Sequence, residues 1–198
     1  MADLEGSLRD IVAALSQEQV SFALVGGLAV AVRAEPRLTR DADLAVAVSG
    51  DDEAEALVLA LRAHGYEAFA AVEHDRVARL ATVRLSRPGH RDSAVTDLLF
   101  SSSGIELEIV AAAESIEVVK GLTVPVARIG HLIVMKVLAR DDRRRPADAD
   151  DLRNLAAVAT AQDWELASTA ARLVVERGFH RDRDVVAALE QLRDAGAV

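Results

Sequence analysis

The chain has 198 residues, of which 51% are hydrophobic, and a formal net charge of -9. This is enough apolar material for one packed domain of ordinary size, with or without a small appendage. The chain contains no cysteine, which excludes a disulfide scaffold, a thiolate zinc site and a cysteine nucleophile. No stretch has the roughly 20 apolar residues of a membrane span, and the acidic N-terminal segment is unlike a secretory signal. We therefore expect a cytoplasmic protein with no membrane partner.

The acidic balance limits which partners the chain can attract. An acidic protein gains little from general attraction to phosphate backbones, so an RNA partner would need a local basic patch or a bridging metal ion. The densest basic run is Arg143–Arg145, which is typical either of an RNA contact or of an exposed linker. With only 3% aromatic residues, base stacking is excluded as a main mode of binding.

Hydrophobic periodicity divides the chain into expected helices and strands. In chain order, we expect a helix over 4–15, a strand over 21–25, a helix over 28–33, a strand over 44–48 and a helix over 51–63. Strands follow over 66–72, 80–86, 93–100, 105–110, 116–120 and 122–127. Helices are expected over 129–140, 148–159, 162–177 and 182–194. The pattern predicts an α/β (α+β) fold: a mixed α/β core over 1–127 and a helical C-terminal part over 128–198.

Asp41 and Asp43 lie at the start of the apolar strand pattern near residue 44. Residues two apart point to the same face of a strand, so their like charges would repel each other. Such paired oxygen ligands suit Mg²⁺, which binds one or two carboxylates together with substrate phosphates. A solvated strand entrance without a metal ion is the alternative interpretation.

Gly26 and Gly27 separate the strand expected over 21–25 from the helix that follows. Glycine lets the backbone approach a ligand closely, and the free N–H groups of a helix N-terminus can bind phosphate. The order of strand, double glycine, helix, loop, paired aspartates and strand predicts a phosphate site beside a metal site.

These residues resemble the signature of the polymerase-beta-like nucleotidyltransferase superfamily, a GG or GS pair followed by DxD. The resemblance implies a nucleotidyltransferase-like mixed sheet flanked by helices and a site for two Mg²⁺ ions held by three carboxylates. Asp41 and Asp43 match the first two, and Asp97, an acidic residue within an apolar strand pattern, matches the third. Glu106 and Glu108 are the competing candidates for that third carboxylate.

Residues 131–157 are similar to bacterial AbiEii-type nucleotidyltransferases, the toxin components of type IV toxin–antitoxin systems. The matching residues are Lys136, Ala139, Arg140, Arg143 to Arg145, Asp148, Asp151 and Leu152. The resemblance implies that Lys136 neutralises triphosphate charge and that Asp148 is an active-site base or the partner of that lysine. Arg40, next to the paired aspartates, is a further candidate for phosphate contact; an ion pair with Asp41 is the alternative interpretation.

The implied reaction transfers a nucleotide from a nucleoside triphosphate such as ATP to a hydroxyl of an RNA such as tRNA, or of a protein. An antitoxin protein would be a further partner. Two alternatives remain open from the residues alone. One is an antibiotic nucleotidyltransferase, whose acidic pocket would suit a cationic aminoglycoside or a lincosamide. The other is an inactive relative that keeps the fold as a binding module.

Overall fold

The computed structural model describes residues 4–74, 77–87, 94–140 and 146–196. The strands are β1 (Phe22–Val25), β2 (Asp41–Val46), β3 (Glu67–His74), β4 (Arg79–Ser86), β5 (Val95–Leu99), β6 (Glu114–Val119) and β7 (Leu122–Val126). The helices are α1 (Leu4–Gln17), α2 (Gly26–Arg33), α3 (Asp51–Ala63), α4 (Glu106–Ala111), α5 (Ile129–Ala139), α6 (Pro146–Val158), α7 (Ala161–Glu176) and α8 (Val185–Gly196). The predicted α/β fold, with a mixed sheet flanked by helices, is confirmed.

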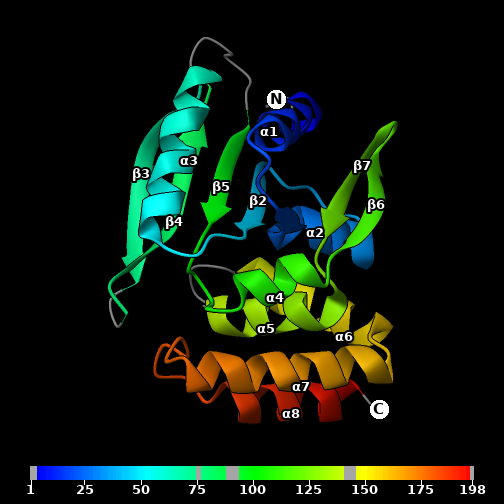
Figure 1. Ribbon diagram of the computed structural model, residues 1–198. Helices are drawn as coiled ribbons and strands as arrows, with labels where there is room; N and C mark the ends of the chain where they lie inside the picture. The colour runs from blue at the N-terminus through cyan, green and yellow to red at the C-terminus, as the bar shows by residue number, and fades with distance from the viewer. Residues whose placement is uncertain (1–3, 75–76, 88–93, 141–145, 197–198) are drawn as a thin grey trace.

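The strands form one seven-stranded sheet in the order β3-β4-β5-β2-β1-β7-β6 (Figure 1). At its centre, β2 pairs antiparallel with β1 and parallel with β5, while β1 pairs parallel with β7. The outer pairs β3–β4 and β6–β7 are antiparallel hairpins. This topology sets the end of β1 beside the start of β2 and places β5 on the other side of β2.

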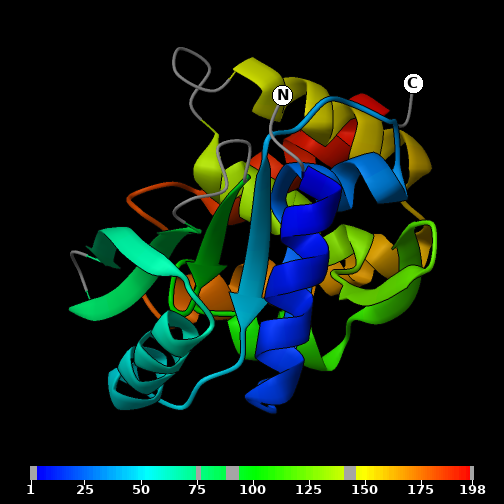
Figure 2. The ribbon, with the colours of Figure 1, turned by 90° about the horizontal axis from the view of Figure 1, so that it is seen from above.

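Helices cover both sides of the sheet. Helices α1 and α3 lie on one side, and α4 to α8 gather on the other (Figures 1 and 2). Leu24 of β1, Leu44 of β2 and Ile133 of α5 are fully buried members of a single hydrophobic core. The core therefore extends from the sheet into the C-terminal helices, and a division of the chain after residue 127 stays a prediction.

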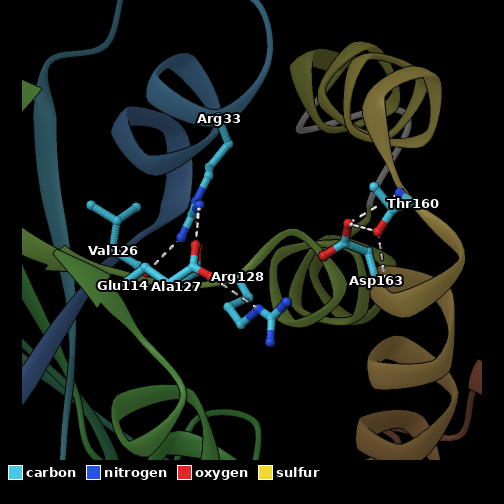
Figure 3. A network of polar contacts seen from close by, with 7 residues as sticks. All are labelled: Arg33, Glu114, Val126, Ala127, Arg128, Thr160 and Asp163. Carbon is cyan, nitrogen blue, oxygen red and sulfur yellow. Dashed lines mark hydrogen bonds and ion pairs between the residues drawn. The ribbon is translucent and has the colours of Figure 1, made fainter. Parts of the chain in front are cut away.

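Helices α5 and α7 approach each other closely at Gly130. A Cβ placed on Gly130 would lie 2.4 Å from the backbone oxygen of Asp163, so a larger residue there would push the helices apart. Asp163 also stabilises the start of α7 in a capping box: its carboxylate accepts a hydrogen bond from the backbone N–H of Thr160, and its own backbone N–H donates to Thr160 Oγ1 (Figure 3).

Arg33, the last residue of α2, ties this helix to the end of β7. Its guanidinium donates from Nη2 to the carbonyl of Val126 and from Nε to the carbonyl of Ala127, both at 3.0 Å (Figure 3). Its Nη1 also forms an ion pair of 2.6 Å with Glu114. These contacts fix the C-terminal end of α2 and so hold its N-terminal end over the start of β2.

The strand predicted over residues 105–110 is wrong, because this segment forms helix α4. Its alternating Ile105, Leu107 and Ile109 are compatible with a strand, yet Ile105 and Ile109 are fully buried while Leu107 is 54% exposed. A spacing of four puts the two isoleucines on one helical face. The Glu106 carboxylate accepts from the backbone N–H groups of Ser102 and Ser103 and stabilises the turn in which the helix starts.

Candidate active site

Asp43 and Asp97 are direct neighbours across the pairing of β2 with β5. On its other side, Asp43 lies opposite Val25, the last residue of β1. Asp41 precedes Asp43 by two residues in the same strand and therefore shares its face of the sheet. The structure thus places the three predicted carboxylates together; below, Asp41, Asp43 and Asp97 are called the carboxylate row.

Gly26 and Gly27 form the first turn of α2 rather than a separate turn before it, and both lie close to the carboxylate row. Gly26 has a φ of +64°, and a Cβ on it would lie 1.9 Å from Asp43 Oδ2. The backbone N–H of Gly27 donates a hydrogen bond to the Asp43 carboxylate. Only glycine at position 26 allows both this backbone conformation and this close approach.

Burial raises the pKa of Asp43 to about 6, and the negative charges of Asp97 and Asp41 add to the increase. Lys136 and the Gly27 N–H act in the opposite direction. A carboxylate that is this costly to ionise is stabilised by a cation, and three carboxylates offer the hard oxygen ligands that Mg²⁺ prefers. The chemistry of the donor set therefore fits a divalent cation.

Asp97 is held by Arg84, a residue of β4 that the sequence analysis missed. Arg84 lies directly opposite Asp97 in the β4–β5 pairing, and it donates from Nε to Oδ1 at 2.8 Å and from Nη2 to Oδ2 at 2.6 Å. Within the described residues, no group of three acidic or histidine side chains is arranged to hold a metal ion as it stands. Both oxygens of Asp97 accept hydrogen bonds from the Arg84 guanidinium.

A second charged group lies where α5 meets α6. Lys136 Nζ forms ion pairs of 2.6 Å with Asp148 and 2.7 Å with Asp151. Arg37 Nε pairs with the other oxygen of Asp151 at 2.7 Å, and Asp151 is completely buried. One Asp148 oxygen, Oδ2, is buried without a hydrogen-bond partner.

The two groups meet at the N-terminus of α2. A Cβ on Gly27 would lie 2.3 Å from Arg37 Nη2, so the guanidinium covers the first turn of this helix. Lys136 acts electrostatically on Asp43. Its Nζ shares Asp151 Oδ2 with Arg37 Nη2. The positive end of a helix dipole, a lysine and an arginine together make a favourable environment for phosphate oxygens next to the carboxylate row.

The remaining candidates lie elsewhere. Arg40 is exposed one residue before β2, and nothing in the described part of the chain joins it to the carboxylate row by a hydrogen bond or ion pair. Glu106 stabilises the start of α4, where burial raises its pKa, and Glu108 forms an ion pair of 2.6 Å with Arg177. Of the three candidates for the third carboxylate, the structure brings Asp97 next to Asp43. Arg143–Arg145 lie outside the described residues.

Sequence offered little signal for Arg37 and Arg84. Nearly all of the 23 basic residues are arginine, so neither residue stands out from the composition. Arg84 could be found only from strand register, and Arg37 only from the path of the loop between α2 and β2. Lys136 did stand out, because Lys120 is the only other lysine.

The fold is similar to that of a solved adenylyltransferase. The lincosamide antibiotic adenylyltransferase LnuA, solved with lincomycin bound, matches with a TM-score of 0.50 and 14% identity over 80% of this chain and 100% of its own. The antibiotic-resistance factor ANT(2'')-Ia matches with a TM-score of 0.49 and 17% identity over 96% of this chain and 89% of its own. JHP933 from Helicobacter pylori has a TM-score of 0.47 and 17% identity over 98% of this chain and 88% of its own.

The sequence also matches the family described as "Nucleotidyl transferase AbiEii toxin, Type IV TA system" over residues 8–196. The chain belongs to this AbiEii family and is a nucleotidyltransferase. A search of curated proteins gave no match. Among the described residues, no helix combines the length and the apolar character needed to cross a membrane.

Proposed function

We propose that this protein transfers a nucleoside monophosphate from a nucleoside triphosphate to a hydroxyl of an RNA such as tRNA, or of a protein, as the toxin of a type IV toxin–antitoxin system. Membership of the AbiEii family supports the toxin role and an antitoxin partner. The observation that supports the chemistry is that Asp43 and Asp97 lie opposite each other on β2 and β5, beside the start of α2.

The carboxylate row would hold Mg²⁺. Bound there, Mg²⁺ would stabilise the negative charge that develops on the attacking and leaving oxygens of an in-line displacement. Asp41 and Asp43 would bind the ion from β2, and Asp97 would bind it from the neighbouring strand β5. Asp97 is also the proposed acceptor of the hydroxyl proton.

Lys136 and Arg37 would neutralise the triphosphate, since Arg37 lies against the first turn of α2 and Lys136 shares the Asp151 carboxylate with Arg37. Asp148 and Asp151 position the Lys136 ammonium from α6. In the reaction, a bond forms between the acceptor oxygen and the α-phosphorus while the bond from that phosphorus to the β-bridging oxygen breaks. The products are the nucleotidylated acceptor, pyrophosphate and one proton.

An acceptor panel tests this proposal. The protein is incubated with Mg²⁺ and each α-labelled nucleoside triphosphate, with total tRNA, with itself as a protein acceptor, and with lincomycin and tobramycin. We expect label on tRNA or protein, and none with Asp41→Asn/Asp43→Asn. Label on an antibiotic alone would replace the toxin role with an antibiotic-modifying one, for which the net charge of -9 is favourable towards a cationic acceptor. No label on any acceptor, with no Mg²⁺-dependent nucleotide binding, would indicate an inactive relative.

A further inference from the structure

Arg84 contacts the carboxylate row at Asp97, the residue that a bound metal cation would also contact. Its guanidinium forms a bidentate pair with Asp97, which takes up both oxygens of that carboxylate. Antiparallel register makes this pairing possible, because Arg84 and Asp97 lie directly opposite each other and point to the same face.

The same guanidinium interacts with the rest of the row. Asp41 and Asp43 both act on Arg84 electrostatically, in addition to Asp97. Three carboxylates this close repel one another, and a bidentate arginine is the strongest neutralising partner that a protein side chain supplies. The Arg84 side chain is 43% exposed, so it can leave Asp97 for solvent or for a phosphate without disrupting a packed core.

We propose that Arg84 is the resident counter-cation of the carboxylate row, and that it competes with a divalent cation for Asp97. The inference rests on the proposed function, which requires a divalent cation at this row. Arg84 is a positioning residue: it lowers the affinity of the empty site for free metal ions. A cation that binds Asp97 displaces the guanidinium, which then becomes available to the incoming triphosphate.

Direct titration of Mn²⁺ tests this competition without any measurement of activity. Binding is followed by the loss of the electron paramagnetic resonance signal of free Mn²⁺, at constant ionic strength and without nucleotide. We expect Arg84→Gln to bind Mn²⁺ about tenfold more tightly than the unaltered protein. Adding Asp43→Asn to Arg84→Gln should remove this gain, which places the ion at the carboxylate row.

Arg79→Gln is the matched control. Arg79 belongs to the same strand, pairs with Asp51 at 2.7 Å, and is 37% exposed, so the variant removes a similar charge and a similar ion pair away from the row. Its Mn²⁺ affinity should stay within about twofold of the unaltered protein. An equal gain in this control would show a general charge effect and would overturn the proposal.

The remaining outcomes separate the inference from the proposed function. Unchanged or weaker Mn²⁺ binding by folded Arg84→Gln, in a protein that transfers label, overturns the inference and leaves the function intact. A gain in Arg84→Gln with no label transfer by the unaltered protein supports the counter-cation and contradicts the function. If Arg84→Gln does not fold, the Mn²⁺ affinity of Arg84→Lys is measured instead, because a lysine cannot bind both Asp97 oxygens as the guanidinium does. An affinity about twofold or more above that of the unaltered protein supports the proposal, and an unchanged affinity overturns it.

Discussion

Gly26 and Asp43 lie so close together that a Cβ on the glycine would be 1.9 Å from Asp43 Oδ2. The first residue of α2 therefore limits the space around a carboxylate of β2. No other residue type at position 26 would leave that carboxylate where it is.

Gly26→Ala should therefore disable the site by moving Asp43. We expect a loss of nucleotidyl transfer of about 100-fold or more, as for a misplaced catalytic group. Gly121→Ala is the control, because Gly121 has a φ of +74° but nothing within 4 Å of its Cβ position. Both variants introduce a strained backbone, so equal activity in the two would show that the contact with Asp43 is unimportant.

Asp43→Asn should lower activity and raise stability at the same time. At neutral pH the ionised Asp43 carboxylate is disfavoured in the fold, since burial and its acidic neighbours raise its pKa to about 6. The neutral amide removes this penalty, and we expect about 1–2 kcal/mol more resistance to urea unfolding in metal-free buffer. Asp52→Asn, an exposed position at the start of α3, should change unfolding by less than about 0.5 kcal/mol. A lower free energy of unfolding for Asp43→Asn would contradict the view that burial and the neighbouring carboxylates disfavour ionised Asp43 in the fold.

Removal of the Lys136 ammonium should leave two buried aspartates without their shared partner. Lys136→Met is expected to lower the free energy of unfolding by about 2–4 kcal/mol and to weaken nucleotide binding. Lys120→Met, at the other lysine, is exposed in the β6–β7 turn and should behave like the unaltered protein. Combining Lys136→Met with Asp148→Asn should recover part of the lost stability. A fully additive loss in urea unfolding would argue against coupling of the pair.

His131 should make the protein less stable in acid. Burial lowers its pKa from 6.5 to about 4; Glu108 opposes this effect and Arg128 adds to it. Between these pH values the imidazole binds a proton more readily in the unfolded chain than in the fold. The free energy of unfolding therefore falls as the pH drops from about 6.5 towards 4.

Urea unfolding at pH 7 and pH 5 measures this effect. The unaltered protein should lose about 1–2 kcal/mol more between the two pH values than His131→Gln, whose side chain does not titrate. The same pH dependence in both proteins would mean that His131 is protonated as easily in the fold as in the unfolded chain.

Short-range patterns predicted much of the fold and brought several candidate residues to notice. Strand periodicity placed Asp41 and Asp43 on one face, and the double glycine marked the start of α2. Ile105 to Ile109 was misassigned because an apolar residue at every second position fits a strand, whereas burial every fourth residue, visible only in the structure, defines the helix. Arg84 was missed because its partner is chosen by register between strands, which local sequence does not encode.

The most direct test of the central claim is the position of the label in the nucleotide. The protein is incubated with Mg²⁺ and the acceptor that the panel identifies, once with α-labelled and once with γ-labelled triphosphate. Transfer of a nucleoside monophosphate predicts that the α-label enters the acceptor and the γ-label leaves in pyrophosphate, and that Asp41→Asn/Asp43→Asn does neither. Entry of the γ-label into the acceptor would contradict nucleotidyl transfer and would indicate phosphoryl transfer instead.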